Sequence, residues 1–192
     1  MSAAGTRPDW DSLYESAAGQ EGHFTTGQAE AAGFSPSLLN HHLRAGRIRR
    51  VRRGVYRLVH FPAGDHEELV VAWLWSDQTA VVSHESALAL HDLSGLMPEK
   101  LHLTLPADWR RRRLRVPKGV VLHFADIESS DRTWFGPVPT TRPARTLRDC
   151  ASSGLSPELL AEAAQEALDR GFVVRSEVAV VEAVLADFGG LE

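Results

Sequence analysis

The chain has 192 residues, of which 43% are hydrophobic and 24% charged, with a net charge of −4, as is typical of a folded globular protein of one or two domains. The single cysteine, Cys150, excludes an intramolecular disulfide and a metal site built from several cysteines. The longest apolar run, residues 69–75, is too short to span a bilayer, and the first residues lack the pattern of a secretory signal, so we expect a cytoplasmic protein without membrane contact.

Positive charge is concentrated in the first third of the chain. Residues 1–60 hold 8 arginines and 5 acidic residues, whereas residues 61–192 hold 13 lysines and arginines and 20 acidic residues. The stretch NHHLRAGRIRRVRRGVYRL, residues 40–58, contains seven arginines and no acidic residue. The pattern breaks at HFPAG, residues 60–64, so we place a domain boundary after residue 60 and expect different partners for residues 1–60 and 61–192.

Three short helices are predicted in and before this stretch. The first covers residues 9–18, with apolar residues at spacings of three and four. Thr25 and Gln28 have the spacing of a capping box, which begins a second helix that Gly33 ends. A Ser-Pro pair at residues 35–36 begins a third helix, which ends at the next glycine. Two short helices joined by a glycine turn, after a leading helix, are the pattern of a helix-turn-helix.

A basic hairpin is predicted directly after the third helix. In RIRRVRRGVYRLV, residues 47–59, β-branched and aromatic residues flank a glycine, as in two strands joined by a turn. Ile48 and Val51 do not share a strand face, so we expect a bulge or a strand start there. A basic hairpin after a helix-turn-helix makes a winged helix, so residues 1–60 are predicted to be a winged helix-turn-helix DNA-binding domain.

The third helix has one apolar and one polar face. Leu39 and Leu43 lie four residues apart on the side that we expect to be buried. The polar face carries four side chains at positions i, i+3, i+4 and i+7: Ser37, Asn40, His41 and Arg44. Asparagine can form two hydrogen bonds to adenine and arginine two to guanine, so this face is suited to reading base edges.

The hairpin is expected to add contacts to the DNA backbone. Its arginines can neutralise phosphates, and an arginine near its tip can enter a minor groove. Arg57 belongs to the same hairpin and is expected to add to its positive charge. The alternative is a solvated charged hairpin that improves solubility. The residues expected to contact DNA are Thr25, Thr26, Ser37, Asn40, His41, Arg44, Arg47, Arg49, Arg50, Arg52 and Arg53.

Residues 61–192 contain both helix and strand patterns. Helices are predicted at residues 67–75, 83–91, 144–151, 157–170 and 175–188. Strands are predicted at residues 101–106 and 119–124, with a hairpin at 133–141 and a short buried strand or turn at 80–82. The predicted fold class is therefore α+β, with an N-terminal winged helix-turn-helix followed by a mixed α+β domain that binds a partner.

A second basic run, DWRRRRLR at residues 108–115, lies between the two predicted strands of this part. Five of its side chains could together stack on and clamp nucleic acid: Trp109, Arg110, Arg111, Arg112 and Arg113. The same run could equally be a solvated loop or a dock for an acidic partner. The sequence leaves these three interpretations open.

No combination of residues predicts catalysis or a bound metal. His84 and His91 are seven residues apart and share a helix face, but the four-residue spacing of a helical zinc motif is absent. The acidic residues at 126–131 lie in a loop of polar turn residues. Cys150 lies among apolar helical residues and is expected to be a buried thiol. We therefore expect no catalytic residue, no metal and no cofactor.

The segment HFTTGQAEAAGFSPSLLNHHLRAGRIRRVRRGVYRL, residues 23–58, resembles the N-terminal winged helix of AbiEi-type antitoxins, the transcriptional regulators of type IV toxin–antitoxin systems. The likeness continues through VVSHESALALHDLSGL, LHLTLP and TTRPARTLRDCA and spans most of residues 20–155. The resemblance implies a repressor that binds inverted repeats of double-stranded DNA in its own promoter. It also implies a second domain that opposes a nucleotidyltransferase-like toxin encoded alongside.

Some relatives with this winged helix carry a restriction-endonuclease-like second domain instead. The acidic and lysine-bearing core of that domain is not found in this sequence. The alternative function is a DNA-targeted enzyme, in which the winged helix delivers a nuclease-like domain. Metal-dependent cleavage of a duplex would distinguish this enzyme from a repressor and antitoxin.

Overall fold

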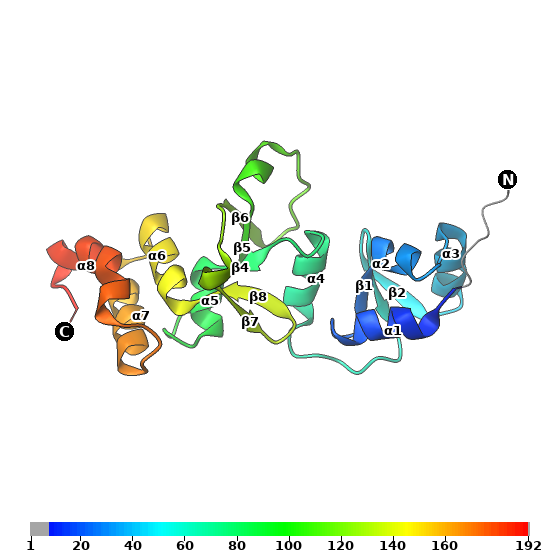
Figure 1. The fold of residues 1–192 in the computed structure, drawn as a ribbon, viewed down its shortest axis with the longest axis horizontal. Helices are drawn as coiled ribbons and strands as arrows, with labels where there is room; N and C mark the ends of the chain where they lie inside the picture. The colour runs from blue at the N-terminus through cyan, green and yellow to red at the C-terminus, as the bar shows by residue number, and fades with distance from the viewer. Residues whose placement is uncertain (1–7, 192) are drawn as a thin grey trace. The chain divides into compact units, whose positions relative to one another are not determined.

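The computed structural model describes residues 8–191 (Figure 1), and the chain divides after Thr79 into two compact units. The first seven residues, on which the expected lack of a secretory signal partly rests, lie outside the described residues. Each unit combines helices with strands, which confirms the predicted α+β class. Among residues 8–191, no helix is long and apolar enough to cross a membrane.

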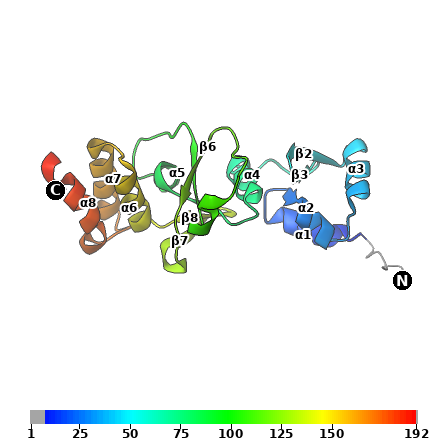
Figure 2. The same cartoon turned by 90° about the horizontal axis from the view of Figure 1, so that it is seen from above.

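The first unit is a winged helix with one additional helix. Its elements are α1 (Trp10–Ala18), β1 (His23–Thr25), α2 (Thr26–Ala31), α3 (Pro36–Arg44), β2 (Ile48–Arg52), β3 (Val55–Leu58) and α4 (Glu67–Trp75). The strands form an antiparallel sheet in the order β1-β3-β2, and α1, α2 and α3 gather around it in both views (Figure 1, Figure 2). The order of elements up to β3 confirms the helix-turn-helix and the hairpin that the sequence predicts.

Local capping interactions set the starts of α2 and α3. The N–H of Gln28 donates to the Thr25 hydroxyl at 3.1 Å, and the N–H of Thr25 donates to the Gln28 side chain at 2.8 Å. The Ser35 hydroxyl accepts the N–H of Leu38 at 3.3 Å, and a proline follows at the first helical position. Gly33, with φ of 83°, provides the left-handed residue that the turn between the two helices requires.

The wing is the β2–β3 hairpin, and it contains the predicted bulge. Arg49 pairs with Arg57, but the register shifts between Arg50 and Arg52. The shift places Val51 outside the regular ladder, as expected from the mismatch in strand faces. The hairpin closes through a glycine with φ of 78°, a conformation that side chains rarely adopt.

A hydrophobic core holds the winged helix together. Phe24 of β1 stacks on Tyr56 of β3, with ring centroids 5.7 Å apart. Leu39 of α3 and Ile48 of β2 are almost completely buried in the same cluster. Each such side chain contributes roughly 1.5–3 kcal/mol by leaving water, so packing rather than helix propensity holds α3 against the wing.

Helix α4 belongs to the first unit, which therefore extends to Thr79, whereas the sequence analysis placed the boundary after residue 60. The Arg57 guanidinium of β3 forms an ion pair with Glu67 of α4 at 2.8 Å and also donates to backbone carbonyls of the connecting segment. Residues 61–66 are thus a connection within the unit, although their proline and glycine are typical of a linker.

The second unit contains a mixed five-stranded sheet. Its strands are β4 (Val81–Val82), β5 (Leu101–Leu105), β6 (Val120–Phe124), β7 (Arg132–Phe135) and β8 (Val138–Thr141). Its helices are α5 (His84–Leu90), α6 (Pro143–Ser153), α7 (Pro157–Asp169) and α8 (Ala179–Leu185), with 3-10 turns η1 (Ala107–Arg111), η2 (Ser129–Asp131), η3 (Arg175–Val178) and η4 (Ala186–Phe188). The sheet order is β6-β5-β4-β8-β7, in which β5–β6 and β4–β8 are parallel pairs.

A second core joins α5 to the C-terminal helices. Leu88 of α5, Leu147 of α6, Leu160 of α7 and Leu185 of α8 are buried in one cluster. Figure 1 and Figure 2 both show α6, α7 and α8 side by side. The helix predicted at residues 175–188 is regular only in its middle, and 3-10 turns form its two ends, as is common at helix termini.

Candidate nucleic-acid interface

Helix α3 presents the predicted polar face to solvent. Ser37, Asn40, His41 and Arg44 are all exposed, while Leu39 is only 3% exposed. The structure therefore brings these four side chains together on one side of α3, as their spacing predicts. Their contact with DNA stays a prediction.

The neighbouring histidine of the same helix has a structural role. His42 is only 5% exposed and packs edge-on against Trp10 and Phe34, with ring centroids 4.8 and 5.9 Å away. Burial, together with the charges of Arg47 and His41, lowers the pKa of His42. An imidazole thus completes the buried face of α3, which the sequence pattern assigned to leucines alone.

The predicted wing arginines keep most of their charge available. Arg47, Arg49, Arg50 and Arg53 are exposed, and Arg52 is partly buried. The Cζ atom of Arg50 lies 5.6 Å from the ring centroid of Tyr56, which orients the guanidinium without neutralising it. Arg49 lies 3.9 Å from Glu67, but its side chain is 55% exposed, so this ion pair is weak. These arginines are accessible to phosphates, and their contact with DNA also stays a prediction.

Arg57 is not part of this exposed surface, contrary to the expectation from its place in the basic hairpin. Its guanidinium donates to Glu67 and to the backbone carbonyls of Leu58, Phe61 and Pro62. Helix α4 contacts β3, and all four residues of β3 are buried, so neither strand face is available to solvent. The signal that could have identified this role is the glutamate at the start of α4, beyond the expected domain boundary.

The two threonines expected to contact DNA lie at the start of α2. Thr25 is buried, and its hydroxyl already accepts a helix N–H as the cap. The N–H of Thr26 donates to the carbonyl of Gly54 at 2.9 Å, which ties α2 to the turn of the wing. Both remain predicted DNA contacts, and Thr26, which is partly exposed, is the more accessible.

The second basic run lies in and after η1. Its exposed residues include Arg110, Arg111, Arg112 and Arg113. The guanidinium of Arg112 lies over the Trp109 ring, 4.1 Å from its centroid, and 3.5 Å from the Asp108 carboxylate. One face of the Trp109 ring is therefore already covered, which disfavours an aromatic clamp for nucleic acid.

The two histidines that the sequence placed on one helix face do not come together. His91 Nε2 lies 2.7 Å from the carbonyl oxygen of Thr141. His84 instead stacks on His123 of β6, with ring centroids 3.5 Å apart, and His123 Nε2 lies 3.1 Å from His102 Nδ1 of β5. Sequence reasoning missed this cluster, whose only signal is one histidine in each of two neighbouring strand patterns.

Burial keeps these histidine rings neutral. Burial, followed by the charges of His123, His102 and Arg145, lowers the pKa of His84 to about 3. Burial and the charge of His102 lower the pKa of His123 to about 4. The contact between His102 and His123 needs one donor and one acceptor nitrogen, which two neutral rings supply. Within residues 8–191, no group of three or more His, Cys, Asp or Glu residues is arranged to hold a metal ion.

The other candidates for chemistry have structural partners. Cys150 is completely buried, and burial raises the pKa of its thiol to about 12, as expected for a structural cysteine. Asp131 forms ion pairs with Arg145 at 2.8 Å and with Arg148 at 3.0 Å. Asp126 accepts a backbone N–H of η1 at 3.1 Å. These two acidic residues are thus held by different parts of the unit.

The fold of the first unit, with its exposed polar helix face, is that of a winged helix-turn-helix domain. Residues 11–59 match the family described as transcriptional regulator, AbiEi antitoxin, and this match confirms the family resemblance over the winged helix. No curated protein matches the chain. The chain is similar to the crystal structure of the Rv2827c protein from Mycobacterium tuberculosis, with a TM-score of 0.42 and 18% identity, over 96% of this chain and 84% of that chain.

Proposed function

We propose that this protein is a DNA-binding transcriptional repressor. One observation carries the proposal: an exposed face of Ser37, Asn40, His41 and Arg44 shares one packed winged helix with a row of exposed arginines. The match of residues 11–59 to a family of transcriptional regulators supports it.

In this function, α3 enters the major groove of a duplex. Asn40 bonds an adenine edge and Arg44 bonds a guanine edge, while the wing arginines neutralise phosphates. Two copies bound to inverted repeats in the protein's own promoter repress transcription of its operon. The base contacts determine which DNA sequence is bound. The phosphate contacts supply most of the salt-dependent part of the affinity.

The second unit is proposed to bind a protein partner without catalysing a reaction. The partner that the AbiEi resemblance implies is a nucleotidyltransferase-like toxin encoded alongside. The description of the matching family as an antitoxin supports this role. Four candidates for chemistry are instead engaged in ion pairs, hydrogen bonds or burial, which favours a binding function over catalysis: His91, Asp126, Asp131 and Cys150.

Base reading by α3 can be tested by fluorescence anisotropy with a promoter duplex and a scrambled duplex of equal length. Asn40→Ala or Arg44→Ala should reduce the preference for the promoter by roughly fivefold or more, since a lost bidentate base contact costs about 1–3 kcal/mol. Glu15→Ala, which removes an exposed side chain of α1, is the control and should keep the preference. Equal losses on both duplexes would show that α3 contacts only the backbone.

Antitoxin activity can be separated from DNA binding by co-expressing the full chain with a neighbouring nucleotidyltransferase-like gene. Growth rescue should persist in the Asn40→Ala/Arg44→Ala double variant, because its second unit is unchanged. Failure of the wild-type chain to rescue growth would contradict the antitoxin role. It would not affect the repressor role, which the anisotropy measurement tests separately. Cleavage of a duplex that requires a divalent metal would favour the alternative, a DNA-targeted enzyme.

A further inference from the structure

The second unit has an open sheet edge. β6 is at the end of the sheet order, so within residues 8–191 no strand pairs with its outer side. In the parallel ladder with β5, Gly119 accepts a hydrogen bond from β5, and the N–H of Ala125 donates to the carbonyl of Leu105. Alternate residues therefore face β5, and the N–H and C=O groups of Leu122 and Phe124 point outward.

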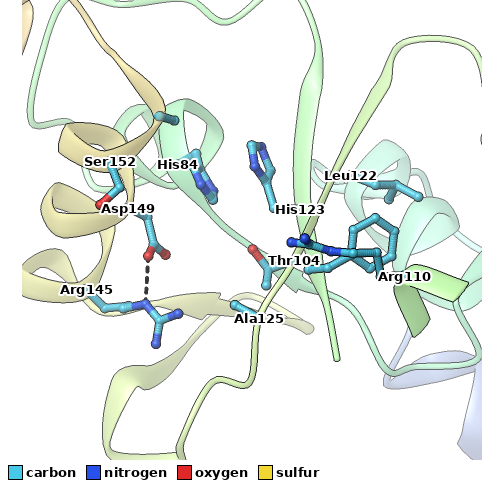
Figure 3. Close-up of a pocket in the computed structure, with 11 residues that line it drawn as sticks. His84, Thr104, Arg110, Leu122, His123, Ala125, Arg145, Asp149 and Ser152 are labelled. Carbon is cyan, nitrogen blue, oxygen red and sulfur yellow. Dashed lines mark hydrogen bonds and ion pairs between the residues drawn. The ribbon is translucent and has the colours of Figure 1, made fainter. Parts of the chain in front are cut away.

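A cavity of about 330 Å³ lies beside β6 (Figure 3). Residues 122–124 of β6, the following Ala125 and Thr104 of β5 line it, with Arg110 of η1 on one side of the strand. Asp149 and Ser152 of α6 lie with His84 on the other side. This volume is within the range of binding clefts, and all five residues of β6 are partly exposed.

The cavity has one uncompensated positive charge. Arg145 of α6 forms ion pairs with Asp131 and Asp149, both at 2.8 Å. Arg110 has no ion pair among the described residues, and its Cζ atom lies 5.9 Å from the ring centroid of Phe124. The other exposed arginines of the basic run adjoin it in sequence. The η1 wall is therefore positive, and the α6 wall is polar with its charges paired.

We propose that this groove binds an acidic, extended segment of a protein partner, which pairs with β6 as an additional strand. The proposal rests on the partner-binding role of the second unit and names the surface and the chemistry of the contact. The main chain of the segment pairs with Leu122 and Phe124, and its side chains alternate between the η1 and α6 walls. An acidic side chain on the η1 side meets Arg110.

The strand edge favours a peptide over a nucleic acid. Leu122 and Phe124 offer N–H and C=O groups at strand spacing, and another peptide backbone supplies the matching acceptors and donors. A nucleic-acid backbone presents phosphate acceptors without a matching series of donors. The sequence of β6, VVLHF, contains no lysine, proline or acidic residue, which are devices that usually protect an exposed edge. An occupied edge explains why such protection is absent.

To test the proposal, the full-length chain is immobilised and used to select binding peptides from a display library of random ten-residue peptides. Enriched peptides should carry Asp or Glu at alternating positions. Leu122→Pro should lower the affinity for these peptides by about tenfold, because it deletes one outward N–H that pairs with the peptide. Proline is tolerated in an edge strand where the lost N–H faces outward, so the fold should survive. Leu122→Val keeps the N–H and should bind like the wild type.

A second pair of variants tests the charge. Arg110→Glu should weaken the same peptides several-fold, whereas Arg113→Glu changes an exposed arginine of the same run outside the cavity and should not. If Leu122→Pro does not fold, amide hydrogen exchange of the wild-type chain, measured with and without peptide, tests the same contact. Peptide binding should then slow exchange of the Leu122 and Phe124 amides, and unchanged exchange would overturn the proposal.

Three results would overturn the inference. They are the absence of enriched peptides, equal binding to a folded Leu122→Pro chain, and binding of oligo-dT that depends on Arg110 but not on Leu122. Growth rescue by the full chain combined with a failed peptide selection would leave the antitoxin role intact and place the partner elsewhere. Promoter binding by the same preparation reports separately on the repressor role, because all these variants leave the winged helix unchanged.

Discussion

Arg49 and Arg57 are directly opposite each other in the ladder between β2 and β3, yet only Arg49 is accessible to DNA. Arg57 is 5% exposed and holds α4 through Glu67. Burial raises the pKa of Glu67, but the hydrogen bond from the Gly64 N–H and the charge and hydrogen bond of Arg57 outweigh it and lower the pKa. Neighbouring arginines of one basic stretch therefore have different environments, one exposed and one buried in an ion pair.

Replacing each of these two arginines should separate stability from DNA binding. Arg57→Ala should lower the free energy of unfolding of the first unit by about 2–4 kcal/mol, because the buried guanidinium donates to Glu67 and to three backbone carbonyls, and all these hydrogen bonds are lost. Arg49→Ala should change it by less than about 0.5 kcal/mol, since its ion pair is exposed. Urea unfolding at neutral pH measures both. Equal stability of the two variants would contradict a structural role for the pair between Arg57 and Glu67.

The histidine cluster should make the second unit less stable in acid. Burial lowers the pKa of His84 to about 3 and that of His123 to about 4. An unfolded imidazole takes up a proton near pH 6.5, so between about pH 6.5 and 4 the unfolded chain binds more protons than the folded chain. The free energy of unfolding of the second unit is therefore highest above this window and falls as the pH is lowered through it.

His84→Asn tests this dependence without demanding a new backbone conformation. His84 has φ of 53°, in the left-handed region that asparagine tolerates better than most side chains. Between pH 7 and 4 the free energy of unfolding should fall in both proteins. We expect the fall to be about 3 kcal/mol smaller in the variant than in the wild type, since one pKa unit corresponds to about 1.4 kcal/mol. His60→Asn, at an exposed histidine, should follow the wild type. Parallel curves for all three proteins would show that the cluster does not govern the pH response.

At the scale of elements, the sequence predicts those helices and strands whose bounds are set by interactions between residues close in sequence. Helices α2 and α3 begin at caps that act over three residues, and the bulge in the wing follows from a mismatch of strand faces. Strand β1 was not predicted, because three residues show no period and the strand forms only by pairing with β3, which is distant in sequence. Helix α4 was predicted with its observed bounds, but its packing on the winged helix depends on contacts distant in sequence.

The candidate sites follow the same division. The polar face of α3 was predictable, because helical periodicity alone determines which side chains share a face. The stack of His84 on His123 was not, because it requires β6 to lie beside β5 and the start of α5 to approach both. The groove at β6 was equally hidden, since a strand is known to be at an edge only when the sheet order is known.

The wing, as an element, should set the salt dependence of DNA binding. Arg50→Ala/Arg53→Ala should reduce the slope of log affinity against log salt by about two, because each phosphate contact contributes about 0.9. Arg111→Ala/Arg113→Ala removes the same charge from the second basic run and should leave the slope unchanged. Anisotropy titrations at several salt concentrations measure both. An unchanged slope in the wing variant would remove the wing from the interface, and a reduced slope in the control would place the second run in it.

At the scale of the whole molecule, the charge asymmetry does not separate the two units. Residues 61–79 belong to the first unit and add four acidic residues: Asp65, Glu67, Glu68 and Asp77. Residues 1–79 therefore hold 8 arginines and 9 acidic residues, a balance of −1, although residues 1–60 alone have a balance of +3. We therefore expect attraction to DNA to come from the local arginines of the wing and α3. Such a local basic surface favours one orientation of the duplex, which net charge alone cannot do.

This distribution makes the fragment boundary the last test. The fragment 1–60 is more positive than the fragment 1–79, so it should bind DNA more tightly if net charge governs binding. We expect the opposite, because cutting after residue 60 removes α4, leaves the Arg57 guanidinium without its carboxylate and exposes the residues that α4 covers. The fragment 1–79 should melt cooperatively in circular dichroism and bind the promoter duplex with nearly the affinity of the full chain. Tight binding by a folded fragment 1–60 would show that α4 is dispensable and that the boundary lies where the sequence placed it.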